Sequence, residues 1–224
     1  MAQTAAVEDY AKAIYALQVR GPGPVTTNDL AERVGVTAGS ASAMLRRLDE
    51  LGLTVHVPYR GVELTDQGRR LALEVLRRHR LLESFLAQEL DLPWDRVHDE
   101  AEILEHVLSD ELEAVIADKL GHPTVDPHGD PIPSPELEFE EPDSESLESL
   151  QPGDRGRFVR VSDSDPEMLR YLSSRGIAPG LGFVVVDRQP FGGPLFVSFD
   201  GAEHAIGGEL ARAMRVTREE ASPG

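Results

Sequence analysis

Two histidines and four carboxylates occupy the nine positions of HDEAEILEH, residues 98–106, and both side-chain types are ligands for metal ions. If the stretch is one helix, at roughly 100° of rotation per residue, four of these groups share an arc of about a quarter turn. The four are His98, Glu102, Glu105 and His106. Because Asp99 follows His98, the stretch lacks the HExxH pattern of zinc proteases. The spacing predicts either a metal site or an exposed polar helix face.

Three other residues carry groups of the same chemistry. His79 and Glu83 lie four residues apart in HRLLE, so a helix here would place them on one face. Asp9 falls early in the first amphipathic segment, where a carboxylate also interacts favourably with the helix dipole. Each pattern alone is typical of a solvated helix surface, and only their combination with residues 98–106 indicates metal binding.

The composition limits the chemistry and the location of the protein. The chain has 224 residues and no cysteine, which excludes disulfides, thiolate metal ligands and a cysteine nucleophile. A chain of this length favours two or three modest domains. No apolar run reaches the ~18 residues of a membrane span, and MAQTAAVEDYAK lacks the features of a signal peptide. We therefore expect a cytoplasmic protein with no membrane partner.

The charge is distributed unevenly along the chain. The net charge of −18 argues against a nucleic-acid partner, because phosphate binding usually needs a basic surface. Residues 1–70, however, hold 8 Lys and Arg against 8 Asp and Glu, whereas the rest of the chain holds 14 against 32. A neutral N-terminal segment is therefore joined to a strongly acidic remainder, and the neutral segment remains compatible with nucleic-acid binding.

The neutral segment has the pattern of a winged helix-turn-helix. Apolar residues recur at helical spacing over residues 7–20. Thr27 or Asn28 can cap a short second helix, and Thr37 caps a third over residues 38–50. Two short β-like runs, LTVHVP and GVELT, flank YRG as a hairpin. A helical hairpin alone would be unspecific, but the β-hairpin with its basic tip favours a DNA-binding domain whose recognition helix is the third helix.

Two longer helices are expected next, over residues 66–92 and 96–120. In the second helix the apolar residues form a stripe too wide for one small neighbour to cover. The stripe consists of Ile103, Leu104, Val107, Leu108, Leu112, Val115, Ile116 and Leu120. Because winged-helix repressors usually pair to read two half-sites, we expect a second copy of the chain to cover this stripe.

The C-terminal part changes from a polar segment to strands. Residues 121–149 are rich in Pro, Ser and Glu, which predicts a partly mobile linker. After Leu150 the runs GRFVRVS, GLGFVVVDRQ and PLFVSFDG predict the strands of a small β-barrel, with one short helix over residues 166–175. The fold class is therefore mainly α with β. The expected domains are a winged helix-turn-helix at 1–70, a helical metal-binding and dimerisation domain at 71–130, a linker at 131–149 and a barrel at 150–217.

Together these segments resemble the diphtheria toxin repressor family of metal-dependent transcriptional regulators over about residues 6–217. The resemblance rests on the winged helix and on RHRLLE, VHDEAEILEH, SDELEAVIADKLG and DPHGDPIP, followed by a barrel similar to the family's SH3-like (FeoA-like) domain. It implies a primary metal site formed by Asp9, Glu102, Glu105 and His106. It also implies an ancillary site at His79, Glu83 and His98 with ligands from the SH3-like domain, for which Asp163 and Asp165 are the candidates.

The ligand set indicates which metal is sensed. In the family, iron-sensing members carry Met and Cys at the positions of Asp9 and Glu102, whereas manganese-sensing members carry Asp and Glu. Independently, three carboxylates and one imidazole without sulfur form a hard, oxygen-rich site suited to Mn²⁺. Fe²⁺, Co²⁺, Zn²⁺ or Cd²⁺ can still substitute in vitro, because raw affinity alone does not select Mn²⁺. Lys12 stands where a short manganese-sensing subgroup has a Glu for a second ion, so the resemblance does not extend to that paired site.

The combined prediction is a manganese-dependent repressor that binds double-stranded operator DNA as a metal-loaded homodimer, with one or two dimers per operator, to control metal-uptake genes. Expected DNA contacts come from hydroxyl and guanidinium groups around the recognition helix and the wing: Thr27, Thr37, Ser40, Ser42, Arg46, Arg47 and Arg60. Three alternatives stay open: an iron-dependent repressor of the same family, a metallohydrolase with an open coordination position, and a winged-helix repressor with a pocket for an apolar ligand.

Overall fold

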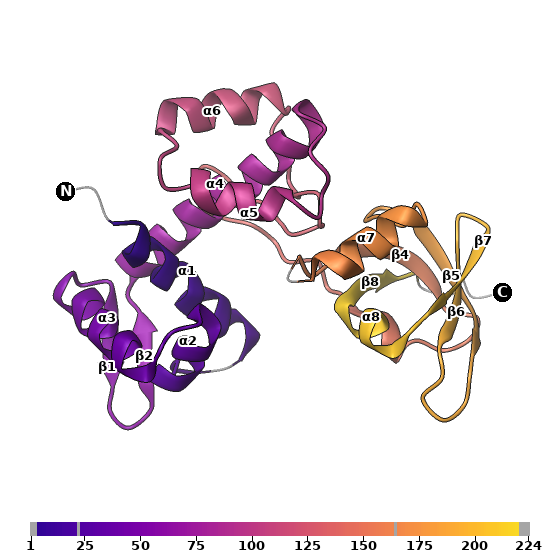
Figure 1. Cartoon of the computed structure of the whole chain (residues 1–224), viewed down its shortest axis with the longest axis horizontal. Helices are drawn as coiled ribbons and strands as arrows, with labels where there is room; N and C mark the ends of the chain where they lie inside the picture. Colours follow the sequence, from indigo (N-terminus) through magenta and orange to yellow (C-terminus); the bar gives the residue numbers. More distant parts are fainter. Residues whose placement is uncertain (1–3, 22, 164, 220–224) are drawn as a thin grey trace. The chain divides into compact units, whose positions relative to one another are not determined.

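The computed structural model describes residues 4–21, 23–163 and 165–219, and Figure 1 shows the order of its helices and strands. The chain divides into two compact units. The first unit comprises Met1–His79, Glu102–Glu113 and Pro133–Glu138, and the second comprises Arg80–Ala101, Ala114–Ile132 and Phe139–Gly224. Each unit therefore combines segments that are far apart in the sequence, and the stretch HDEAEILEH contributes to both.

The N-terminal part is a winged helix-turn-helix, as its sequence predicts. It begins with three helices, α1 (Ala5–Arg20), α2 (Thr27–Val34) and α3 (Ala38–Glu50). The hydroxyl of Thr26 accepts a hydrogen bond from the Asp29 amide, so the cap of α2 lies one residue before the expected Thr27. Thr37 caps α3 as expected by accepting from the Ser40 amide. The left-handed Gly35 (φ 71°) ends α2 and allows the tight turn into α3.

The wing is a two-stranded antiparallel hairpin of β1 (Thr54–Val57) and β2 (Gly61–Leu64). Val62 turns inward and joins the core formed by α1, α2 and α3, where Leu30, Leu48 and Leu53 are fully buried. Gly61 has φ +126°, and a Cβ on it would lie 2.1 Å from the carbonyl oxygen of Val25. Only glycine permits this close approach, which fixes the wing against the strand-like segment before α2.

The helical part differs from the sequence-based expectation at one important point. The first long helix, α4 (Asp66–Glu89), is continuous. The single helix expected over residues 96–120 is wrong, because α5 (Val97–Leu104) ends before Glu105 and α6 begins at Asp110 and runs to Lys119. Ser109 caps the new helix, since its hydroxyl accepts from the Leu112 amide at 3.2 Å and its carbonyl from the Glu113 amide at 2.9 Å.

Large apolar side chains remain exposed around this break. In the first unit Ile103, Val107 and Leu112 are 68%, 77% and 49% exposed. Leu108, between them, is buried. The helical region therefore covers part of the predicted apolar stripe itself and leaves another part accessible to a partner.

The C-terminal domain is a six-stranded antiparallel sheet with the strand order β3-β8-β4-β5-β6-β7. The strands are β3 (Glu145–Ser146), β4 (Arg155–Val161), β5 (Gly182–Arg188), β6 (Leu195–Phe199), β7 (Ala202–Ile206) and β8 (Met214–Arg218), accompanied by a 3₁₀ turn η1 (Leu147–Ser149), α7 (Pro166–Ser174) and α8 (Gly208–Ala213). Phe158, Leu169 and Leu172 lie in its buried core, against which Trp94 also packs. The expected β4, β5, β6 and α7 are present, whereas β7, α8 and β8 had not been singled out from the sequence.

The expectation of a partly mobile linker over residues 121–149 is wrong for its first third. Val125 pairs with Pro131 in an isolated antiparallel bridge, and Ile132 is buried. The His128 side chain is fully buried, and its backbone carbonyl accepts a hydrogen bond from the Val161 amide at 3.0 Å. The loop over residues 124–132 (the DPHGD loop) is therefore packed into the second unit. Among the described residues, no helix combines the length and the apolar character needed to cross a bilayer.

The close approach at Gly61 can be tested by substitution. We expect Gly61→Ala to lower the free energy of unfolding by more than about 2 kcal/mol, because the added Cβ meets backbone and the φ angle is unfavourable for alanine. Gly39→Ala on α3 is the matched control, since its Cβ meets nothing closer than 3.8 Å and alanine favours the helix. Chemical denaturation of both variants measures the difference, and equal stabilities would contradict the packing described here.

Candidate metal centre

The residues of HDEAEILEH belong to two separate clusters, one in each unit. His106 joins Asp9 and Glu105 in the first unit, because the end of α5 releases residues 105–107 into a turn. His98 lies on α5 and joins Glu83 and Asp163 in the second unit. The expectation that His98 and His106 share one helix face is therefore wrong, and the crowding of ligands in this stretch reflects two clusters rather than one.

The first cluster has the geometry of a metal site around His106 Nε2. Asp9 Oδ1 lies 3.0 Å and Glu105 Oε1 3.6 Å from this nitrogen. Asp9 Oδ1 is buried, yet makes no well-formed hydrogen bond with any described residue. The Glu105 side chain is fully buried. Buried carboxylate oxygens directed at an imidazole nitrogen match the donor arrangement of a divalent cation site.

Glu8 fixes the orientation of His106. Its Oε2 lies 2.6 Å from His106 Nδ1, and a carboxylate can only accept in this pair, so Nδ1 carries the proton. In the neutral imidazole the lone pair is then on Nε2, which faces Asp9 and Glu105. The sequence analysis missed Glu8. The available signal was its place beside Asp9 in the first turn of α1.

Lys12 supplies the positive charge at this cluster. Its Nζ lies 2.6 Å from Glu105 Oε1 and 2.7 Å from Glu102 Oε1. Burial lowers the pKa of Lys12, but the Glu105 and Glu102 carboxylates outweigh that effect and raise the pKa above its ordinary value. The ammonium group therefore stays charged and contacts two of the four predicted primary ligands, in the manner expected of a bound cation.

The electrostatics of the cluster favour a further positive charge. Burial raises the pKa of Asp9; His106 and Lys12 oppose the rise, whereas Glu102 and Glu105 add to it. Four carboxylates, those of Glu8, Asp9, Glu102 and Glu105, converge here on one ammonium group and two imidazoles. These oxygen and imidazole donors, in a chain that has no cysteine, fit a hard divalent ion.

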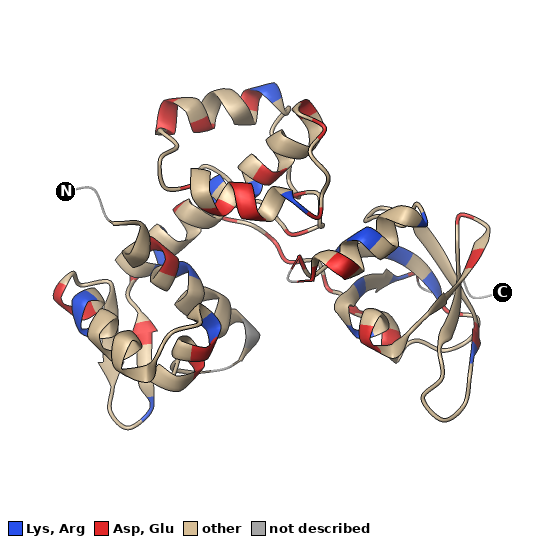
Figure 2. Ribbon diagram, in the orientation of Figure 1, with Lys and Arg blue, Asp and Glu red and all other residues tan. Residues whose placement is uncertain are grey.

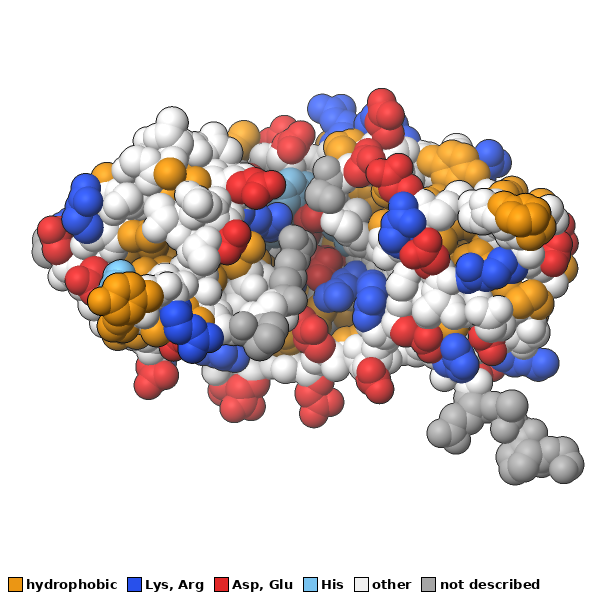
Figure 3. Space-filling model, turned by 90° about the horizontal axis from the view of Figure 1, so that it is seen from below, with side chains coloured by type: hydrophobic (Ala, Val, Ile, Leu, Met, Phe, Trp, Pro, Cys, Tyr) orange, Lys and Arg blue, Asp and Glu red, His pale blue; other side chains and the backbone are white. Residues whose placement is uncertain are grey.

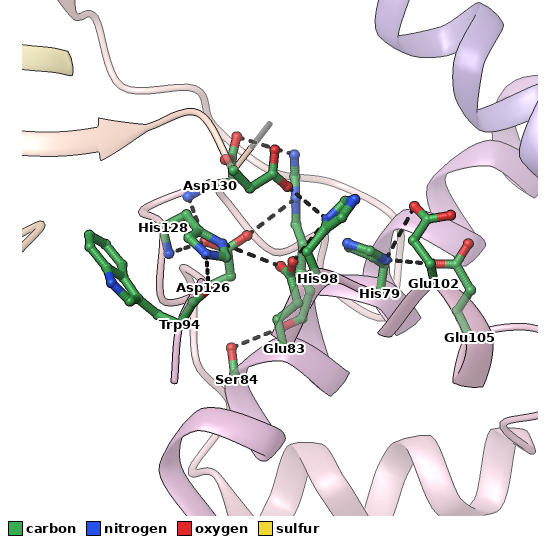
Figure 4. A network of polar contacts seen from close by, with 12 residues as sticks. His79, Glu83, Ser84, Trp94, His98, Glu102, Glu105, Asp126, His128 and Asp130 are labelled. Carbon is green, nitrogen blue, oxygen red and sulfur yellow. Dashed lines mark hydrogen bonds and ion pairs between the residues drawn. The ribbon is translucent and has the colours of Figure 1, made fainter. Parts of the chain in front are cut away.

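His79, predicted as an ancillary ligand, lies beside the primary residues in the first unit. Its Nδ1 is 2.5 Å from Glu105 Oε2 and 3.9 Å from Glu102 Oε1 (Figure 4). The Oε1 atom of Glu105 therefore faces His106 and Lys12, and its Oε2 atom faces His79. His79 is placed to orient Glu105, and its assignment to the ancillary set stays a prediction.

The second cluster brings together three of the predicted ancillary residues. His98 Nδ1 lies 3.0 Å from Asp163 Oδ2 and 3.4 Å from Glu83 Oε1. Hydrogen bonding to Asp163 and then to Glu83 raises the pKa of His98 to about 10. Asp163 follows β4, so a residue of the C-terminal domain completes this cluster. Asp165, the other predicted ancillary ligand, instead caps α7: its Oδ1 accepts hydrogen bonds from the amides of Glu167 and Met168.

The predicted DNA-contacting residues surround α3 and the wing. Thr37, Ser40, Arg46, Arg47 and Arg60 are exposed, whereas Thr27 and Ser42 are partly buried. In the ribbon of Figure 2, positions of Lys and Arg are coloured blue on α3 and at the tip of the β1–β2 hairpin. Over the face drawn in Figure 3, acidic and basic side chains are mixed rather than separated into a single basic patch. Electrostatic attraction to DNA would therefore be local to α3 and the wing.

Comparisons with known proteins give one consistent result. Three domain families match the chain: iron dependent repressor, N-terminal DNA binding domain, at residues 3–62; iron dependent repressor, metal binding and dimerisation domain, at 65–134; and FeoA domain, at 145–218. The iron-dependent repressor IdeR of Mycobacterium tuberculosis is 31% identical, with 94% of this chain and 96% of IdeR covered. The diphtheria toxin repressor of Corynebacterium efficiens is 35% identical, with 94% of each chain covered.

A solved structure is also similar over nearly the whole chain. A manganese-dependent transcriptional repressor in complex with manganese is 46% identical and superposes with a TM-score of 0.86. The match covers 95% of this chain and 100% of that chain. The order of DNA-binding, helical and FeoA parts is therefore common to this chain and to the proteins it resembles.

The role of Glu8 can be tested through metal affinity. We expect Glu8→Ala to weaken Mn²⁺ binding at the first cluster by about 10- to 100-fold, because His106 then loses the acceptor that fixes its tautomer. Glu8→Gln is the control, since its amide oxygen can still accept from Nδ1. Isothermal titration calorimetry provides the comparison, and equal losses in both variants would show that the charge of Glu8 matters rather than its hydrogen bond.

Lys12 should compete with metal. In Lys12→Met the carboxylates of Glu102 and Glu105 lose their ammonium partner, so we expect Mn²⁺ to bind about tenfold more tightly, or ~1.4 kcal/mol. Lys119→Met removes the same charge from an exposed pair with Glu89 and should leave the affinity unchanged. Chelator-competition titrations measure both affinities. Weaker binding in Lys12→Met would mean that the lysine supports the metal site instead of competing for it.

Proposed function

The chain belongs to the diphtheria toxin repressor family of metal-dependent transcriptional repressors, and we propose that manganese is the metal to which it responds. In this proposal the metal-loaded homodimer binds double-stranded operator DNA and represses metal-uptake genes. Mn²⁺ binds at Asp9, Glu102, Glu105 and His106, and a second ion binds at the ancillary cluster of Glu83, His98 and Asp163.

The absence of sulfur from the donor set carries this proposal. Asp9, Glu105 and His106 offer carboxylate and imidazole donors within 4.8 Å of one another, and Glu102 is linked to them through Lys12 and Glu105. Such donors suit a hard ion, and a site that requires six ligands disfavours the four-coordinate geometry of Zn²⁺. The similar solved repressor contains manganese, whereas the similar mycobacterial and corynebacterial proteins include an iron-dependent repressor. Iron is therefore the second candidate.

Metal would act by joining two segments of the first unit. Asp9 lies on α1 of the winged helix domain, and Glu105 and His106 lie in the turn after α5. Without a divalent ion, His106 and Lys12 offset the repulsion among these carboxylates in part. A bound ion adds positive charge and ties α1 to the turn, and so selects the arrangement that is competent for DNA binding.

DNA recognition would combine α3, the wing and a dimer. Arg46 and Arg47 on α3 and Arg60 on the wing suit phosphate contacts, and hydroxyl groups near the start of α3 can reach bases. Because few side chains on α3 can read bases, DNA shape and half-site spacing would supply much of the specificity. The exposed Ile103, Val107 and Leu112 offer an apolar surface for the second copy of the chain.

Metal-titrated DNA binding tests this function. We expect operator affinity, measured by fluorescence anisotropy under anaerobic conditions, to rise at lower free Mn²⁺ than Fe²⁺, and Zn²⁺ to activate incompletely. Activation by Fe²⁺ at concentrations where Mn²⁺ has no effect would replace manganese by iron in the proposal.

The assignment of the primary site has its own test. We expect Asp9→Ala to remove Mn²⁺-dependent operator binding while the circular dichroism spectrum stays unchanged, because Asp9 is a ligand and not a core residue. Glu100→Ala is the control, since it removes an exposed carboxylate from the same HDEAEILEH stretch. Full Mn²⁺ activation of Asp9→Ala would show that the ion acts elsewhere.

A further inference from the structure

A pocket lies between the recognition helix α3 and the wing, within the first unit of the chain. Its volume is about 270 Å³, and it is open to solvent. The helix contacts β1 of the wing directly (Figure 1). The residues that line the pocket come from α2, α3 and the hairpin: Thr27, Ser42, Leu45, Arg46, Asp49, Thr54, His56, Gly61 and Val62. Two of them, Asp49 and His56, have no role in the metal clusters or among the predicted DNA contacts.

The lining suits an anionic ligand better than an apolar one. Sites for apolar molecules are lined mainly by hydrophobic and aromatic side chains. Here Thr27, Ser42 and Thr54 supply hydroxyl groups, and Arg46 and His56 supply N–H donors. Donors of these kinds match the oxygen atoms of a phosphate group. The pocket therefore gives no support to the alternative of a repressor that binds an apolar ligand.

The helix α3 places its polar groups along one side of the pocket. Ser42, Arg46 and Asp49 follow one another at intervals of four and three residues, so they share one face of α3. Arg46 is exposed, and its Nη1 lies 3.5 Å from Ser42 Oγ, which is a long hydrogen bond. This contact occupies one of five N–H groups of the guanidinium. Arg46 therefore keeps donors for a ligand in the pocket.

The wing supplies donors from the other side of the pocket. Thr54 and His56 are two residues apart on β1, so their side chains lie on the same face of the strand. His56 is exposed, and an imidazole has at least one N–H donor in either protonation state. Thr54 is 2% exposed, and its buried hydroxyl has no hydrogen-bond partner among the described residues. A ligand oxygen would offer such a buried hydroxyl an acceptor and recover the free energy lost by its burial.

The position of the pocket identifies the source of the phosphate. A recognition helix lies in the major groove, which is about 12 Å wide and has a phosphate backbone along each side. Because the wing lies beside α3, the backbone on that side runs between the two elements, along the pocket. A phosphodiester of the bound duplex therefore reaches Arg46 from one side and His56 from the other.

We propose that this pocket binds one backbone phosphate of the operator in each subunit, held jointly by Arg46 of α3 and His56 of the wing. The inference rests on the proposed function and adds to it a residue, His56, that fixes the wing and α3 on the same phosphate. Asp49 places a carboxylate in the same pocket, which repels phosphate. A phosphate is therefore held only where both donors reach it, and Asp49 weakens binding to DNA that does not fit.

A double-mutant cycle tests whether the two donors hold the same phosphate. The probe is a duplex selected from random-sequence DNA by the metal-loaded, full-length wild type. We expect Arg46→Gln and His56→Ala each to weaken binding about tenfold, and the double variant to lose far less than the product of the two. Arg47→Gln is the matched control, because it removes the neighbouring exposed guanidinium, which does not line the pocket. Its loss should multiply with that of His56→Ala.

Neutral methylphosphonate linkages, introduced one at a time, locate the phosphate on the DNA. We expect one position in each half-site where the change weakens the wild type but leaves the affinity of the Arg46→Gln, His56→Ala double variant as it was. Multiplicative losses for this pair, or no such position in the duplex, would overturn the proposal. Binding of inorganic phosphate to the wild type without DNA, lost in the double variant, would replace the backbone phosphate by a free anion.

Asp49 has a separate readout in binding to a duplex of unselected sequence. We expect Asp49→Asn to bind this duplex several-fold more tightly than the wild type, because the phosphates then meet no carboxylate in the pocket. An unchanged affinity would contradict the role given to Asp49. Failure of the proposed function would appear differently, as a wild type that binds no duplex at saturating Mn²⁺ or Fe²⁺.

Discussion

This structure depends on one constraint: it buries negative charge that its own cationic side chains balance only in part. Glu105 shows it most clearly, because its fully buried carboxylate contacts Lys12, His79 and His106 at once. Burying such a carboxylate costs several kcal/mol unless it is paired, so these neighbours stabilise the folded state without metal. The same partial balance underlies the proposed response to metal, since a divalent ion would relieve repulsion that Lys12 and the two histidines leave in place.

The break between α5 and α6 divides the metal-ligating side chains between two separate clusters. His98 stays on α5 and meets Asp163 of the C-terminal domain, whereas His106 leaves the helix and meets Asp9 of α1. One short stretch thus contributes to the cluster that contacts the winged helix and to the cluster that contacts the FeoA domain. If metal binds at both clusters as we propose, it would act on both ends of the chain through residues only eight positions apart.

Much of the fold could be predicted from the sequence, because local signals agree with it. Thr37 and the hairpin around YRG located α3 and the wing. The helix expected over residues 96–120 failed because apolar periodicity continues through a break that the cap at Ser109 creates. The linker expectation failed because a segment rich in proline and acidic residues can still be ordered by tertiary contacts, as His128 and its partners show. For the site, the types of ligand could be predicted from the sequence. Supporting residues such as Glu8 could not, because the contact of Glu8 with His106 joins residues 98 positions apart.

The central claim is that a divalent ion joins α1 to the turn after α5, and amide hydrogen exchange of the full-length protein measures this directly. With saturating Mn²⁺, we expect exchange to slow in both α1 (Ala5–Arg20) and residues 102–113, because the ion bonds to Asp9 on one side and to Glu105 and His106 on the other. Slower exchange in residues 102–113 alone, with α1 unchanged while Mn²⁺ is bound, would contradict the account.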